Sequence, residues 1–345
     1  MAGEVEDAAN ALARPPADMA YCAPIWLPGG NLQTIWAARA ARRHVGAVPR
    51  WARSRWDTPD GDFIDVDRAL HVSAPGAPLL VLFHGLEGSS ASHYAQAFAG
   101  FAAENRLAFA VPHFRGCSGE LNRAPRAYHS GDFEEIDWVL KRFAAEAPER
   151  ALLAVGVSMG GNALLRWAGE SGDSASRTVR AVAAVSSPLD LAAGGHAIGR
   201  GFNRLVYTRM FLATLVPKAL QKLDQHPGLF DRDALLAARD LYAFDNLFTA
   251  PLHGFRDTDD YWQRASAKPL LGAVRLPALA LNARNDPFVP ASSLPTAQQV
   301  SASVTLWQPA QGGHVGFPGV DGPLALPGHV RNMPWAVGRW LLSHA

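Results

Sequence analysis

One serine of the chain stands in a setting that could make its hydroxyl a nucleophile. Ser158 lies in Gly156-Val157-Ser158-Met159-Gly160-Gly161, after an apolar run over residues 151–155 and before a segment with helical spacing. This is the G-x-S-x-G pattern in its strand–turn–helix context, in which the glycines permit a sharp turn and the serine projects above a sheet. The helix N-terminus behind it favours developing negative charge. A glycine-rich turn with a solvated serine is the alternative.

A serine of this kind needs a general base further along the chain, and His314 is the candidate. In sites built on this turn the order is Ser, then Asp or Glu, then His. His314 lies in Gly312-Gly313-His314-Val315-Gly316-Phe317, a glycine-rich loop after the last expected strand. The alternative is a loop histidine held by the backbone. His329 and His344 flank the final helix and are expected at the surface, and the other downstream histidines fall in an insertion: His196, His226 and His253.

The base needs an acid that orients its ring, and two aspartates compete for this role. Asp286 follows the expected strand over residues 276–281, and Pro287 and Pro290 would stiffen its loop. Asp190 follows the preceding strand. We favour Asp286, although an aspartate before proline is also common as a turn cap.

A tetrahedral intermediate would also need two hydrogen-bond donors. One is the backbone N–H of Met159, directly after the serine, and the other comes from the loop after an earlier strand. That loop is His84-Gly85-Leu86-Glu87-Gly88, so Leu86 is the expected second donor. His84 is expected to be structural. A phosphate-binding loop is not indicated, because neither G-x-G-x-x-G nor G-x-x-x-x-G-K occurs here.

These residues require a sheet whose strands end at one edge. Apolar runs alternate with amphipathic segments, and residues 51–57 and 62–70 read as a hairpin joined by Asp60-Gly61. The pattern predicts an α/β fold, with a mainly parallel central sheet flanked by helices and functional groups at the carboxyl ends of the strands. Further strands are expected at these positions: 79–83, 107–111, 151–157, 179–185, 276–281 and 304–307.

The expected organisation is a flexible lead-in over residues 1–20 and a single domain over 21–345. That domain carries a helical cap insertion over about residues 190–275, with helices near 207–223 and 232–242. Phe211 and Leu215 in this cap are candidates to line an acyl pocket. Contact with a membrane surface is a second option, and packing of an ordinary cap helix on the core is the plainer one.

Composition excludes several classes of protein. The 345 residues are 48% hydrophobic, and 32 Lys and Arg balance 31 Asp and Glu, so there is no basic excess for binding nucleic acid. Two cysteines cannot build a disulfide framework, and Cys117 between turn glycines is expected to be structural. No metal or organic cofactor is expected. Without an apolar run of 18 residues or a basic leader, neither a transmembrane segment nor a signal peptide is indicated, and a cytoplasmic location is expected.

Four stretches give the chain a family resemblance. It resembles the YheT-like branch of the α/β-hydrolases, which includes bacterial esterases and eukaryotic abhydrolase-domain lipid hydrolases. Two of the stretches occur across the superfamily and two are more specific. They are residues 26–36 (Trp-Leu-Pro-Gly-Gly-Asn-Leu-Gln-Thr-Ile-Trp), 84–88, 114–119 with 128–131, and 156–162. Asn31 stands where many relatives would have histidine, which could alter the N-terminal packing.

The resemblance implies the triad Ser158, Asp286 and His314, and a serine hydrolase that cleaves carboxylic esters of short- to medium-chain acyl groups or acylglycerols through an acyl-enzyme. The substrate would be a small acyl ester or lipid, and peripheral membrane contact and oligomeric state stay open. An acyltransferase with the same triad is one alternative, since only its acceptor differs. A non-catalytic binding protein on the same fold is another, and an intact triad argues against it.

Overall fold

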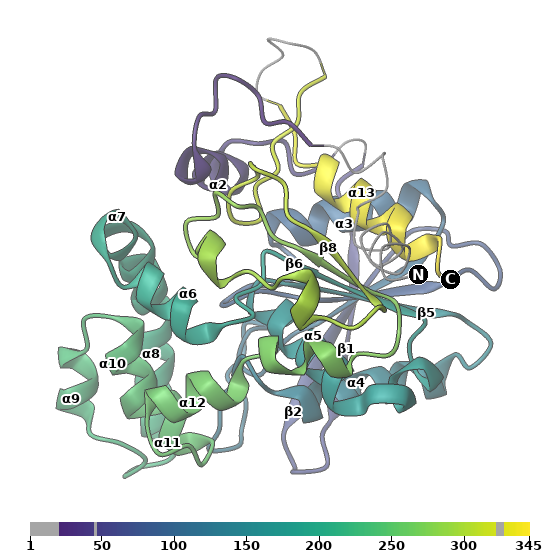
Figure 1. The fold of residues 1–345 in the computed structure, drawn as a ribbon. Helices are drawn as coiled ribbons and strands as arrows, with labels where there is room; N and C mark the ends of the chain where they lie inside the picture. Colours follow the sequence, from purple (N-terminus) through teal and green to yellow (C-terminus); the bar gives the residue numbers. More distant parts are fainter. Residues whose placement is uncertain (1–20, 45–46, 322–327) are drawn as a thin grey trace.

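The computed structural model describes residues 21–44, 47–321 and 328–345 (Figure 1). The expected lead-in over residues 1–20 therefore lies outside the described residues. An eight-stranded sheet crosses the molecule in the order β1-β2-β4-β3-β5-β6-β7-β8. The strands are β1 (Trp51–Asp57), β2 (Phe63–Ala69), β3 (Leu79–Phe83), β4 (Ala108–Pro112), β5 (Leu152–Val157), β6 (Ala181–Val185), β7 (Ala278–Leu281) and β8 (Val304–Trp307).

The sheet is parallel from β4 to β8 and antiparallel at one edge. Strand β2 pairs antiparallel with both β1 and β4. Every residue of β3, β5 and β6 is buried, as expected for strands covered on both faces. The predicted strands, the hairpin and the α/β fold class are confirmed, with bounds that differ by one or two residues.

Helices cover both faces of the sheet (Figure 1). One face packs against α3 (His93–Glu104) and α13 (Asn332–Leu342), and the other against α4 (Phe133–Glu146) and α5 (Met159–Ser171). Each layer has its own apolar core, so the sheet is held rigidly between them. The helix α2 (Gly30–Arg39) contributes to neither large core and lies near the carboxyl ends of the strands.

The segment between β6 and β7 contains helices and turns but no strand, and in Figure 1 it extends to the left of the sheet. Several of its helices run on through π-helical turns, so Gly201–Gln225 is one continuous helical stretch. The elements are α6 (Leu191–Ile198), α7 (Gly201–Asn203), η3 (Arg204–Thr208), α8 (Arg209–Gln225), α9 (Arg232–Ala237), α10 (Leu241–Phe244), η4 (Asp245–Thr249), α11 (Ala250–Leu252), α12 (Thr258–Ala265) and η5 (Lys268–Ala273).

The prediction of one helix over 232–242 is wrong, because the chain forms two helices there. Ala238 adopts extended backbone angles (φ −60°, ψ 131°), which ends α9. Asp240 then caps α10, its carboxylate accepting from the Ala243 N–H. An N-cap aspartate satisfies a free amide of a new helix, so it favours a fresh start over continuation.

None of the helices in the described part of the chain is both long and apolar enough to cross a membrane.

Candidate active site

Ser158 occupies a strained turn between β5 and α5. Its backbone has φ 54° and ψ −120°, an unusual conformation for a residue with a side chain, and its N–H donates to the Val185 oxygen over 2.8 Å. A Cβ at position 160 would come within about 2.5 Å of the Phe83 and His84 carbonyl oxygens. Only glycine therefore fits there, and this crowding holds the serine above the sheet edge, as the sequence pattern predicts.

The structure brings Ser158, His314 and Asp286 into one chain of hydrogen bonds. His314 Nε2 lies 3.0 Å from Ser158 Oγ, and His314 Nδ1 lies 2.9 Å from Asp286 Oδ2. Since an ionised carboxylate can only accept, Nδ1 carries the proton that it donates to Asp286. Nε2 is then left to accept from the serine hydroxyl, which is the arrangement that general-base activation of a serine needs.

Asp286 is held far more firmly than its rival. Its side chain is fully buried, and Oδ1 also accepts from the Phe288 and Val289 backbone N–H groups. It is thus both a turn cap and the partner of His314. The Asp190 side chain is 36% exposed, caps α6 through the Ala193 N–H and does not contact His314.

The loop that carries His314 is fastened to α2 by two buried side chains. Gln33, with none of its surface exposed, accepts through Oε1 from the Gly312 N–H (2.9 Å) and from Asn285 Nδ2 (3.0 Å). Thr34 Oγ1 accepts from the His314 N–H over 2.8 Å. These bonds fix the backbone at His314 and two residues before it, so α2 positions the imidazole.

The same helix also reaches the acid loop and the insertion. Asn285, next to Asp286, donates to Gln33 and accepts from the Gly313 N–H. On the other side of α2, Asn31 Oδ1 accepts from Tyr207 OH in η3 over 2.9 Å. These positioning roles were not predicted from the sequence. The resemblance marked residues 26–36, but nothing local in them indicates a partner near residue 312.

The residues that carry the two expected oxyanion donors line the same cavity as the serine. Leu86, Met159, Ser158 and His314 line one cavity. A Cβ at Gly85 would lie 3.1 Å from the Ser158 Cβ, so the loop after β3 lies directly against the nucleophile turn. Among the described residues, neither the Leu86 nor the Met159 backbone N–H has an acceptor.

The residue after Leu86 is held by a polar contact that crosses to the insertion. Glu87 has a left-handed backbone (φ 56°), and its N–H donates to Tyr128 OH over 3.0 Å. Its carboxylate accepts from Tyr128 OH (2.8 Å) and pairs with Lys218 Nζ of α8 (2.8 Å). Glu87 and Tyr128 lie in sequence motifs that indicated no role for either side chain, and none of those motifs contains Lys218.

Three further expectations have clear outcomes. His84 is buried and structural: Nδ1–H donates to the Gly85 oxygen, Nε2 accepts from the Phe114 N–H, and burial lowers its pKa to about 3. Burial raises the pKa of the Cys117 thiol to about 12, which agrees with a structural role. The prediction that His329 lies at the surface is wrong. It is 6% exposed, because its backbone bridges to Gly319 in both directions.

The cavity beside Ser158 has a volume of about 130 Å³ and lies between the strand ends and the insertion. Phe211 and Leu215 of α8, the two candidates from the sequence, both line it. Its size is close to that of a cavity that holds a benzene ring, about 150 Å³. Further apolar lining comes from Ile198, Phe244, Phe248, Trp262 and Phe288.

Two titratable groups in the cavity wall are satisfied by the protein itself. Asp245 accepts from Thr249 Oγ1 and from Trp262 Nε1, and burial raises its pKa to about 6. His129 Nδ1 accepts from the Gly131 N–H, and burial lowers the pKa of this histidine to about 3. The wall therefore offers a mainly apolar surface to a ligand.

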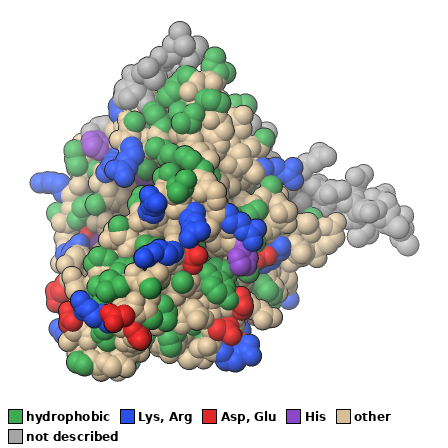
Figure 2. Space-filling model, turned by 90° about the vertical axis from the view of Figure 1, so that its left-hand side faces the viewer, with side chains coloured by type: hydrophobic (Ala, Val, Ile, Leu, Met, Phe, Trp, Pro, Cys, Tyr) green, Lys and Arg blue, Asp and Glu red, His purple; other side chains and the backbone are tan. Residues whose placement is uncertain are grey.

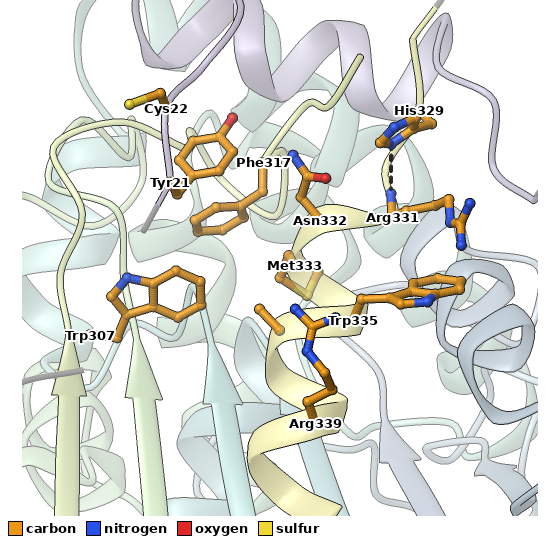
Figure 3. Close-up of a pocket in the computed structure, with 11 residues that line it drawn as sticks. Tyr21, Cys22, Trp307, Phe317, His329, Arg331, Asn332, Met333, Trp335 and Arg339 are labelled. Atoms are coloured by element: carbon orange, nitrogen blue, oxygen red, sulfur yellow. Dashed lines mark hydrogen bonds between the residues drawn. The ribbon is translucent and has the colours of Figure 1, made fainter. Parts of the chain in front are cut away.

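A larger hollow of about 500 Å³ lies beside α13 (Figure 3). Tyr21 and Phe317 stand on one side of it, and Trp335 and Arg339 come from the helix. His329 accepts there from the Arg331 backbone N–H. None of the residues of the Ser158 site lines this hollow, so the two spaces are separate among the described residues.

Residues 78–319 match the family model of the alpha/beta hydrolase fold. The chain is 38% identical to the Escherichia coli protein named "Putative esterase YheT", over 86% of each chain. It is 33% identical to Phospholipase ABHD3 of Mus musculus, over 75% of this chain and 64% of that one. A monoacylglycerol lipase of Saccharomyces cerevisiae is 28% identical, over 70% of this chain and 55% of the yeast protein.

Solved structures share the fold at low sequence identity. Pyrococcus furiosus esterase Pf2001 superposes with a TM-score of 0.54 at 15% identity, over 88% of this chain and 99% of that one. A bacterial membrane phospholipase A gives a TM-score of 0.53 at 18% identity, over 91% and 89%.

Proposed function

Since this chain belongs to the YheT-like branch of the α/β-hydrolase family, we propose that it is a serine hydrolase that cleaves carboxylic esters of short- to medium-chain acyl groups or of acylglycerol-like lipids. The observation that carries the proposal is the hydrogen-bond chain from Ser158 through His314 to Asp286 beside an apolar cavity. The names of its relatives, an esterase, a phospholipase and a monoacylglycerol lipase, support an ester substrate.

In the proposed mechanism His314 Nε2 takes the proton of the Ser158 hydroxyl while Oγ attacks the ester carbonyl carbon. The backbone N–H groups of Leu86 and Met159 donate to the oxygen that becomes negative. Removing one such donor typically raises the barrier by about 3–4 kcal/mol. His314 then protonates the leaving alcohol, and a water activated by the same imidazole cleaves the acyl-enzyme. Asp286 holds the ring and stabilises its positive charge.

We further propose that the helices from α6 to α12 form a cap that shapes the acyl pocket of a single domain. Support comes from the cavity, which Ser158 shares with Phe211 and Leu215. The small volume and apolar wall favour a short aliphatic acyl group over a charged one.

An acyltransferase with the same residues is the second candidate, and a binding protein without catalysis is the third. Labelling by a fluorophosphonate serine probe tests the nucleophile and would exclude the binding protein. Hydrolysis of acetyl to decanoyl esters, repeated with an added alcohol, then separates the two enzymes. A hydrolase yields free acid as the main product, whereas a transferase yields the new ester. No labelling and no turnover would contradict both enzymatic functions.

Truncating the cap side chains should change which acyl length is preferred. Phe211→Ala and Leu215→Ala enlarge the cavity, so kcat/KM should shift toward longer acyl chains while acetyl ester turnover changes little. Each buried methylene contributes about 0.8 kcal/mol, which is about fourfold in kcat/KM. Leu212→Ala is the matched control, because Leu212 belongs to the same helix but does not line the cavity. If the dependence of kcat/KM on acyl length were identical to that of the wild type, Phe211 and Leu215 would serve only to pack the cap.

Breaking the contact between the cap and the Leu86 loop should slow chemistry more than it weakens substrate binding. We propose that the Glu87–Lys218 pair positions the Leu86 N–H. Lys218→Met should therefore lower kcat about tenfold with little change in KM, which is a smaller loss than the roughly 10²- to 10³-fold caused by removing an oxyanion donor altogether. Lys218→Arg should restore most of the activity. The control is Lys141→Met, which removes an exposed ion pair with Asp137 on α4. An equal loss in the control, or a change in KM alone, would contradict this role.

A further inference from the structure

The outer side of the insertion exposes a group of large apolar side chains. Phe202, Leu205 and Met210, on the continuous stretch Gly201–Gln225, are 52%, 59% and 44% exposed. Leu32 on α2 is 49% exposed. The two elements are in direct contact through the bond from Tyr207 OH to Asn31, so we describe these four apolar side chains as one surface, the α2–α7 face.

The charged side chains in the two segments that carry the α2–α7 face, residues 21–56 and 191–223, are all basic. Arg200, Arg204 and Arg209 are exposed, and none of them pairs with a carboxylate among the described residues. The stretches 21–56 and 191–223 contain no Asp or Glu, although the whole chain has a net charge of only +1. Figure 2 shows this side of the molecule: Lys and Arg spread across its middle with hydrophobic side chains between them, and most Asp and Glu lie lower.

The inner side of the same helical stretch belongs to the Ser158 site. Phe211, adjacent to the exposed Met210, lines the cavity. Tyr207 packs on Phe288 with ring centroids 4.5 Å apart, and Phe288 packs on His314 at 4.2 Å. Two aromatic side chains in contact, Tyr207 and Phe288, therefore connect the helical stretch that carries the α2–α7 face to the imidazole that the mechanism uses.

We propose that the α2–α7 face docks on a lipid surface that carries anionic headgroups. Insertion of exposed Phe, Leu and Met side chains at the boundary between headgroups and acyl chains is favourable. Arginine side chains bind phosphate groups through two parallel N–H donors. Basic groups near such a surface add to the binding, and salt screens them. The purpose of this docking, which is to bring ester lipids to the cap, rests on the proposed function. Binding to the lipid surface itself requires no catalysis.

The test is sedimentation with vesicles of phosphatidylcholine alone or mixed with phosphatidylglycerol. Ser158→Ala protein serves as the parent, so that no lipid is hydrolysed. We expect it to bind the anionic vesicles more tightly than the neutral ones, and to lose affinity as salt rises. Neutralising Arg204 and Arg209 with glutamine should weaken binding about fivefold for each arginine. The pair Phe202→Ser and Leu205→Ser should weaken binding to both kinds of vesicle.

Leu70 and Val72 provide a matched control, because they are 53% and 78% exposed, follow β2 and belong to neither element of the α2–α7 face. Leu70→Ser with Val72→Ser should leave vesicle binding unchanged. Failure of the parent to bind anionic vesicles, or equal losses in the control pair, would overturn the docking proposal. In the background with Ser158 intact, all these variants should cleave a soluble acetyl ester at the wild-type rate. Absence of that activity in the wild type would count against the proposed function and leave the vesicle result standing.

Discussion

Replacing Ser158 with alanine is expected to lower kcat for ester hydrolysis by about 10⁶, the scale of loss when the nucleophile of a serine triad is removed. Labelling by the fluorophosphonate probe should vanish, because no other group takes over the attack. The fold should persist, since the change removes only one hydroxyl and its hydrogen bond to His314. The expected change in the free energy of unfolding is within about 1 kcal/mol.

The measurement combines steady-state rates, probe labelling and thermal unfolding on the pure variant. Ser174→Ala is the control, since Ser174 is an exposed serine after α5 that bonds only to nearby backbone. Turnover near the wild-type rate in Ser158→Ala would remove Ser158 from the mechanism. If Ser174→Ala also lost all turnover and labelling, the loss would come from the protein preparation and not from the Ser158 hydroxyl.

The second large effect is expected at Asp286. Asp286→Asn should lower kcat by about 10⁴, because an amide in place of the carboxylate favours the wrong tautomer of His314. Asp190→Asn should cost less than tenfold. Its side chain caps α6 and has only a long, part-exposed ion pair of 3.9 Å with Lys268 Nζ, and asparagine caps a helix about as well as aspartate.

Kinetics of the two asparagine variants on one ester decide between the acids. The variants are isosteric with the wild type, and a matched thermal unfolding curve shows that the loss is not one of folding. If Asp190→Asn proved the more damaging of the two, the acid would have been assigned to the wrong strand.

Local signals predicted most of the fold and the three residues now joined by hydrogen bonds. The turn around Ser158 needs only a strand, three glycines and a helix close together in sequence, so one window reveals it. Asp286 and His314 could be ordered along the chain because each follows a buried strand, and the carboxyl ends of parallel strands share an edge.

Contacts between distant segments could not be predicted in this way. The pair of Glu87 and Lys218 spans 131 positions, and the bond from Gly312 to Gln33 spans 279. In both pairs, the sequence around one residue contains no pattern that identifies the other residue as its partner. His329 was placed at the surface for the same reason, since its burial depends on a bridge to Gly319 and on the packing around it.

The attachment of α2 to the His314 loop sets the order in which a growing chain can acquire its chemistry. Gln33 is synthesised early, but its side-chain oxygen cannot accept from the Gly312 N–H until 279 further residues have been added to the chain. The contacts that shape the nucleophile turn come from β5, β6, α5 and the segments that follow β3 and β6, and all of these precede residue 190, so they are synthesised long before then. A nascent chain that stops short of residue 312 would contain Ser158 but not His314. The proposed ester cleavage would therefore be acquired last, when α2 binds the His314 loop.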